Sequence, residues 1–86
     1  MEVVEVAATD LEKGQIVLDI NLGGSLYPCM FRVVDKNVEE GDLNLEFISK
    51  VDNKGNKIDI PSPYSIDSTG FTPFTLYGVF YLVVED

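Results

Sequence analysis

The sequence contains no histidine, a single cysteine and only 6 basic residues among 86. Without histidine the chain lacks the usual general base, the partner of serine and cysteine nucleophiles, and the commonest transition-metal ligand. Cys29 lies beside Met30 and Phe31, an apolar setting in which a thiol normally fills a core, and it has no partner for an internal disulfide. These absences argue against an enzyme and against a metal or cofactor site.

The basic residues are outnumbered by 15 acidic ones, which gives a formal net charge of −9 at pH 7. Such a charge repels nucleic-acid phosphates and anionic lipids, so we expect no direct binding to nucleic acid or membrane. It suits either solubility alone or a basic protein partner. The first residues, "MEVVEVAATD", are acidic where a secretory signal is basic, and the longest apolar run, Leu76 to Val84, is too short for a membrane helix. We therefore expect an intracellular protein at synthesis.

Motifs that would carry chemistry are incomplete. The stretch "DNKGNKID" is superficially similar to a calcium-binding loop. However, Lys54 occupies the position of a calcium ligand and Lys57 the position of the EF-hand glycine, so a hairpin turn explains the stretch better. Gly23 and Gly24 fit no phosphate-loop spacing. A hydrolase using two carboxylates would need a pair about 5–10 Å apart beside a cleft, which a chain of this size offers little room for.

Apolar and polar residues alternate with period two along most of the chain, which predicts short strands joined by turns that contain Gly14, Gly23, Gly24 or Gly41. The pattern predicts strands over residues 3–8, 16–20, 27–35 and 43–50, a short one after the turn at 53–56, and a last one within 76–86. The fold class is therefore all-β, a small single-domain barrel or sandwich of the SH3-like or OB-like kind, with five to six short strands over residues 1–86.

The apolar face of each alternating strand supplies the predicted core, namely Ile16, Leu18, Phe31, Val33, Leu45, Phe47 and Val79. The last strand differs from the others because both of its faces are apolar. Val79, Tyr81 and Val83 lie on one face, and Phe80, Leu82 and Val84 on the other. If it is an edge strand, its second face needs a cover, which indicates a contact with a partner or with another copy.

Residues 61–74, "PSPYSIDSTGFTPF", have the composition of a loop but hold Tyr64, Phe71 and Phe74. Two interpretations are open. The rings fold back and cap one end of the barrel, which enlarges a thin core, or they stand outward and anchor a protein partner. Long loops without strands are uncommon in compact domains unless they have a function.

The pieces "ATDLEKGQIV" and "YGVFYLV" resemble the turn-glycine-strand segment and the terminal strand of small phage capsid decoration (cement) proteins. The two pieces cover under a quarter of the chain. The resemblance implies a non-enzymatic protein that assembles on a capsid lattice, often as an oligomer, and would place this protein in the virion.

We therefore expect a non-enzymatic protein-binding or structural protein, most concretely capsid-associated or accessory, whose partner is another protein, a capsid lattice or itself. The expected partner-binding residues lie in the 61–74 loop and the last strand: Tyr64, Phe71, Phe74, Phe80 and Leu82. The alternative is an acidic inhibitor that blocks a basic nucleic-acid-binding surface of a target, for which binding would weaken steeply with salt.

Overall fold

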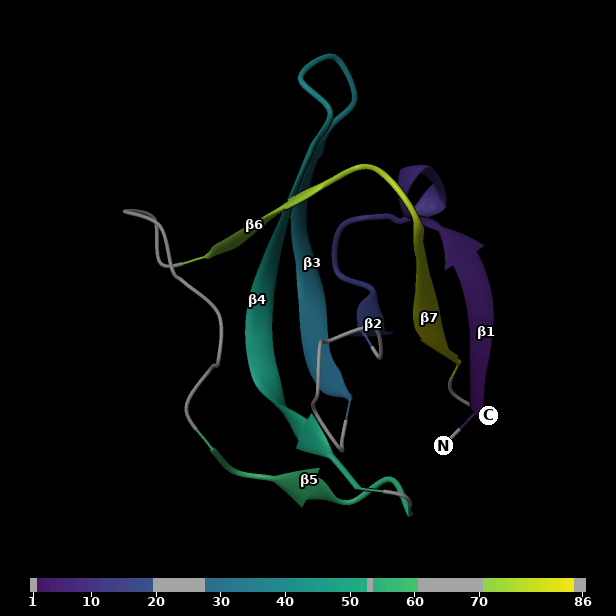
Figure 1. Ribbon diagram of the computed structural model, residues 1–86, viewed down its shortest axis with the longest axis vertical. Helices are drawn as coiled ribbons and strands as arrows, with labels where there is room; N and C mark the ends of the chain where they lie inside the picture. The colour runs from purple at the N-terminus through teal and green to yellow at the C-terminus, as the bar shows by residue number, and fades with distance from the viewer. Residues whose placement is uncertain (1, 20–27, 53, 61–70, 85–86) are drawn as a thin grey trace.

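The computed structural model describes residues 2–19, 28–52, 54–60 and 71–84, and the account below concerns these residues. They form an all-β fold, as predicted, in which one antiparallel sheet curls into a half-barrel (Figure 1). The described part of the chain has no α-helix, only a single 3₁₀ turn, η1 (Ala8–Asp10). None of its helical residues makes a segment long and apolar enough to cross a membrane.

Seven strands are described, more than the five to six predicted. In chain order they are β1 (Glu2–Ala7), β2 (Ile16–Asp19), β3 (Cys29–Asn37), β4 (Asp42–Val51), β5 (Lys57–Ile58), β6 (Thr72–Thr75) and β7 (Val79–Val84). The unexpected one is β6, which occupies the end of the segment predicted to be a loop. Its Pro73 is compatible with a strand because β4 is the one described strand that β6 pairs with, and an edge strand tolerates a missing N–H.

The strands are ordered β1-β7-β2-β3-β4 across the sheet, and the far side of β4 pairs with both β5 and β6. The last strand, β7, therefore lies between β1 and β2, where Figure 1 shows it beside β1. The expectation that it is an edge strand is wrong. Its continuous apolar sequence reflects two clusters, because Phe80 and Leu82 pack in the main core on one face and Tyr81 and Val83 pack in a second cluster on the other.

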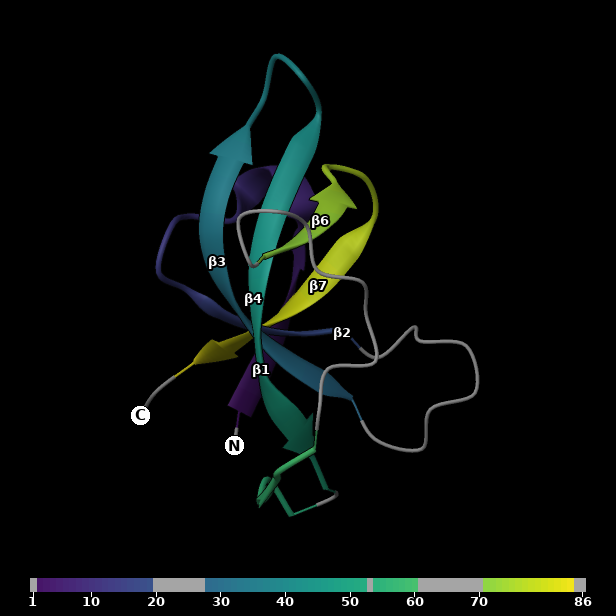
Figure 2. The ribbon, with the colours of Figure 1, turned by 90° about the vertical axis from the view of Figure 1, so that its left-hand side faces the viewer.

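The long β3–β4 hairpin gives the sheet its curl. Its pairing shifts register between Met30 and Phe31 and again between Val33 and Asp35. Such bulges bend a strand and increase its twist. The turn at its tip uses Gly41 with a φ of 72°, a conformation that favours glycine. Figure 2 shows the result, with β4 in front of the molecule and β1 behind it.

The main core fills the concave side of the sheet around Phe31. Its other buried members are Ala8, Leu11, Val17, Cys29, Val33, Leu43, Leu45, Leu76 and Phe80, with Val6, Phe47, Phe74 and Leu82 packed against them. The ring of Phe31 meets those of Phe47 and Phe74 edge to face, with centroids 5.8 Å and 5.4 Å apart.

The predicted core is confirmed in β3 and β4, where Phe31, Val33 and Leu45 are fully buried. Phe47 is half-buried against this core. The prediction fails for Val79, which is 39% exposed, while its neighbour Phe80 is 5% exposed.

A similar one-residue error affects β2, whose inward residue is Val17. Leu18 is buried, as predicted, and Ile16 is half-buried, but both belong to a second cluster apart from the main core. In β7 both faces are apolar, and in β2 the alternation of Ile16 and Leu18 with Val17 and Asp19 indicated the face of the second cluster, so alternation alone does not identify the inward face.

Candidate functional site

The residues predicted to bind a partner lie mostly within the domain. Phe80 is buried, and Leu82 is half-buried against the main core. The expectation that this face of β7 points outward is therefore wrong, because β7 turns Phe80 toward the core. Phe74 is half-buried between Phe31 and Phe80, so for this ring the capping interpretation holds. Phe71 is half-buried, and Tyr64 lies outside the described residues.

The opposite face of the sheet carries a second apolar group, which we call the outer cluster. Its buried members are Leu18, Met30 and Val51, with Ile16, Ile48, Tyr81 and Val83 packed against them and half-buried. Successive residues of a strand point to opposite faces, so these side chains alternate with those of the main core. The sheet is thus apolar on both sides. The sequence signal for this face was the two-sided apolar pattern of β7.

The register of the strands lines these residues up across the sheet. Tyr81 of β7 lies opposite Leu18 of β2, Leu18 opposite Met30 of β3, and Met30 opposite Ser49 of β4. Directly opposed residues of antiparallel strands share a face and lie about 4.5–5.5 Å apart between Cβ atoms. The four strands therefore present a continuous row. Its last member, Ser49, is 4% exposed, and its hydroxyl has no hydrogen-bond partner among the residues that the structure describes.

Polar side chains border the cluster in the neighbouring row. Ile16 of β2 lies opposite Arg32 of β3, which lies opposite Glu46 of β4. Arg32 Nη2 is 3.2 Å from Glu46 Oε1, and both side chains are about half exposed. An exposed ion pair of this kind adds little stability. The ion pair between Arg32 and Glu46 therefore forms a polar border along one side of the apolar outer cluster.

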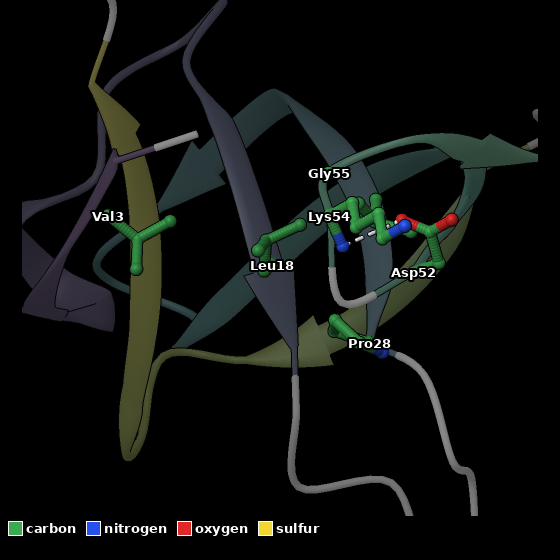
Figure 3. Close-up of a pocket in the computed structure, with 7 residues that line it drawn as sticks. Val3, Leu18, Pro28, Asp52, Lys54 and Gly55 are labelled. Atoms are coloured by element: carbon green, nitrogen blue, oxygen red, sulfur yellow. Dashed lines mark hydrogen bonds between the residues drawn. The ribbon is translucent and has the colours of Figure 1, made fainter.

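A pocket of about 210 Å³ opens at the edge of the outer cluster (Figure 3). Leu18 of β2 lies at its middle, with Val3 of β1 on one side and the turn after β4 on the other, as the close-up shows. Its remaining lining comes from Pro28, Val51, Asp52, Lys54 and Gly55. Val3 is 39% exposed, so the wall that it forms is accessible from outside.

The turn on the pocket's far side is shaped by Asp52. Its Oδ1 accepts hydrogen bonds from the backbone N–H groups of Lys54 and Asn56, both at 2.9 Å, and its carbonyl accepts one from Gly55 at 3.0 Å. These bonds, the one from Asn56 foremost, hold the pKa of Asp52 below its ordinary value, because they favour the charged carboxylate. Gly55 has a φ of 85°. The hairpin turn predicted for "DNKGNKID" is thus confirmed, and it fixes Lys54 at the pocket rim.

The pocket is small, and its lining combines apolar side chains with Asp52 and Lys54. Ligand pockets usually enclose about 300–1,000 Å³, so this one suits a single side chain better than a whole small molecule. Cys29 lies in the main core, where burial raises the pKa of its thiol and keeps it protonated. Among the residues that the structure describes, no three His, Cys, Asp or Glu side chains gather as metal ligands would.

Comparison with family models, with curated proteins and with solved structures gave no match to this chain. The resemblance to capsid decoration proteins therefore stays a prediction.

Proposed function

We propose that this protein is a non-enzymatic protein-binding domain that docks on another protein through the outer cluster and its pocket. The observation that carries the proposal is the apolar character of both faces of the sheet. An antiparallel sheet that packs one face on its core usually presents a polar, solvated second face. Here the second face is apolar from β7 to β4. Its centre, Leu18, Met30 and Val51, is 2–6% exposed, so the surface open to a partner is its margin.

The exposure of the individual residues supports a contact at this surface. Ile16, Tyr81 and Val83 are only half-buried, and Val3 and Val79 are each 39% exposed. A partner would remove their remaining apolar surface from water, which stabilises a complex by about 25 cal/mol per Å² before the costs of association. The pocket beside Leu18 suits one apolar anchor side chain of the partner, since interface anchors typically insert into such pockets.

This proposal revises which residues of β7 take part. Tyr81 and Val83 lie on the outer face, whereas Phe80 and Leu82 pack toward the main core. Tyr81 also suits the role chemically, because tyrosine combines a large apolar surface with a polar tip and is enriched at interfaces.

The most concrete form of the proposal is a structural or accessory protein of a viral capsid, which binds the capsid lattice and forms homo-oligomers there. Its support is the resemblance of "ATDLEKGQIV" and "YGVFYLV" to decoration proteins, together with a small β-rich fold. Light scattering of the purified protein tests the oligomer, and co-sedimentation with capsids tests the lattice.

An acidic inhibitor of a nucleic-acid-binding protein is the second proposal, and the net charge of −9 favours it. The two differ in their response to salt. An apolar contact through the outer cluster survives high ionic strength, while a charge mimic loses affinity steeply because counterions screen exposed charges.

The outer face is tested with Val3→Glu, which places a carboxylate on the exposed wall of the pocket. Val38→Glu is the matched control, because Val38 is 67% exposed and lies between β3 and β4 at the hairpin tip. Proteins captured by the wild type are identified by mass spectrometry, and their affinities are then measured for both variants. We expect Val3→Glu to weaken binding at least tenfold and Val38→Glu to leave it unchanged. Equal affinities for both variants would contradict the proposal.

A further inference from the structure

The two outer edges of the sheet are built differently. Beyond β4 lie β5, which has only two residues, and β6, which contains Pro73. Short strands and prolines are the usual means by which proteins protect sheet edges from pairing with another chain. At the other end of the sheet lies β1, and β7 is its one neighbour among the described strands.

The edge at β1 has none of these protections. It has six residues, contains neither proline nor a basic residue, and pairs with β7 without a register shift from Glu2 to Ala7. In an antiparallel pair, every second residue directs its N–H and C=O groups toward the partner and the others direct theirs away. Among the described residues no strand pairs with β1 on the side away from β7, so backbone donors and acceptors on that side are available to another strand.

We propose that β1 accepts an extended, basic segment of another protein as an additional strand of the sheet. The backbone groups at the free edge provide the hydrogen bonds, as in other cases of strand addition. The side chains of Val3 and Val4, 39% and 44% exposed on opposite faces, provide apolar contacts for the added strand. The charged residues of β1 are Glu2 and Glu5, so lysine or arginine on the partner complements them.

The same charges argue against a second copy of this chain as the occupant. A second copy would bring its own acidic edge, with Glu2 and Glu5, close to the same acidic edge of the first copy, and like charges brought close together repel. The net charge of −9 on each copy adds to this repulsion. A basic segment is attracted to Glu2 and Glu5, whereas a second copy of this acidic chain is repelled by them.

This edge is a separate surface from the outer face. Strand addition uses the backbone of β1 and the side chains beside it, whereas the outer face extends over β7, β2, β3 and β4. Ile16→Ala distinguishes the two, because Ile16 belongs to the outer cluster but lies on β2, which β7 separates from β1. It should weaken docking on the outer face and leave the binding of a basic strand unchanged.

The test uses a synthetic valine-rich peptide with two lysines three positions apart, a spacing that lets them lie beside Glu2 and Glu5 on opposite faces of the strand, titrated into the protein at low salt while amide hydrogen exchange is followed. We expect protection of alternate amides of β1 and no new protection in β5 or β6. A peptide of the same sequence with N-methyl groups along one edge cannot pair on that edge, and we expect it to bind at least tenfold more weakly. Equal binding of the two peptides, or protection elsewhere than in β1, overturns the proposal.

Charge variants separate a local from a general electrostatic effect. Glu2→Lys with Glu5→Lys reverses the charge of the edge, and Glu39→Lys with Glu40→Lys makes the same change in net charge at the exposed hairpin tip. We expect the first pair to weaken peptide binding at least tenfold more than the second. Equal losses overturn the proposal. So does a wild-type dimer in light scattering whose β1 amides are already protected, because the occupant would then be a second copy.

Discussion

The rings of Phe74 and Phe80 meet edge to face, with centroids 5.9 Å apart and planes inclined by 75°. Phe74 comes from β6 and Phe80 from β7, and the turn between these strands is held where Leu76 N–H donates to the carbonyl of Gly41 at 2.9 Å. Phe74 also meets Phe31, so rings from three strands close one end of the main core. A segment with the composition of a loop thus contributes part of the interior.

The inward side of β7 can be checked by comparing neighbours. Phe80→Ala should destabilise the domain by about 3–5 kcal/mol, because Phe80 is 5% exposed and its loss leaves a cavity. Val79→Ala should cost less than about 1 kcal/mol, since Val79 is 39% exposed. Urea unfolding measures both. Equal losses would mean that the two faces of the strand are equally buried.

The contact between Phe74 and Phe80 has a coupling energy of its own. Edge-to-face pairs contribute about 0.5–1.5 kcal/mol beyond the area they bury, so a double-mutant cycle with Phe74→Leu and Phe80→Leu should give a coupling in that range. The control cycle replaces Phe74 and Val79, because Val79 lies on the other side of β7. A coupling near zero for Phe74 and Phe80 would contradict the ring contact.

The hydroxyl of Ser49 offers a test of the outer row. Its oxygen is buried without a hydrogen-bond partner, and a buried unpaired polar group costs about 1–3 kcal/mol. Ser49→Ala removes that group with little change in volume, so we expect stability to be unchanged or increased in thermal melts. A loss above about 1 kcal/mol would show that the hydroxyl makes a stabilising bond.

Cys29 should be inert in the folded protein. Burial raises the pKa of its thiol above the ordinary value of 9.0, so the thiolate that reacts with disulfide reagents is scarce. We expect no reaction with such a reagent at pH 8 and complete reaction in denaturant.

The same shift of Cys29 makes stability depend on pH. Because the folded pKa is raised, the unfolded chain loses this proton first, and stability falls as pH rises past 9.0. Cys29→Ala should remove that part of the alkaline slope, which denaturant melts between pH 7 and 10 can measure. An unchanged slope would contradict the assignment.

The turn at Asp52 has the opposite dependence. Hydrogen bonds from Asn56, Lys54 and Gly55 lower the pKa of Asp52, so its contribution to stability is present above the unfolded value of 3.8 and is lost as pH falls below it. Asp52→Ala should lower the melting temperature at pH 7. The difference in melting temperature from the wild type should shrink as the pH falls below 3.8. Asp59→Ala removes the same charge from an exposed position and serves as the control.

The strands were predictable where one face of the sheet is polar. In β4, Leu43 and Leu45 alternate with Asn44 and Glu46, so the inward face could be recognised without a structure. In β7 both faces are apolar, and in β2 Asp19 on the face of Val17 made Leu18 look like the inward residue, although Val17 packs in the main core. The core residues were therefore predicted correctly in β3 and β4. In β2 and β7 the predicted inward face was displaced by one residue.

The candidate site could not be predicted, because it depends on which strands become neighbours. The outer row joins Tyr81 to Leu18 and Met30, residues far apart in the sequence. The open edge at β1 follows from the insertion of β7 beside it. Strand β6 was missed because Pro73 and the serines before it have turn composition, while its pairing with β4 is a long-range effect.

The position of β7 between β1 and β2 also affects how this protein is made. Residues 79–84 leave the ribosome after every other described strand, yet they join β1 to the sheet and complete one side of β2. Until then only the β2–β3–β4 meander and its attachments can form, with the apolar side of β2 uncovered. Pairing of Glu2 with Val84 joins residues 82 positions apart in the sequence, and such long-range pairing is slow. A nascent chain of this protein therefore exposes an incomplete sheet until β7 has been synthesised and has paired, a state in which unpaired strand edges favour aggregation.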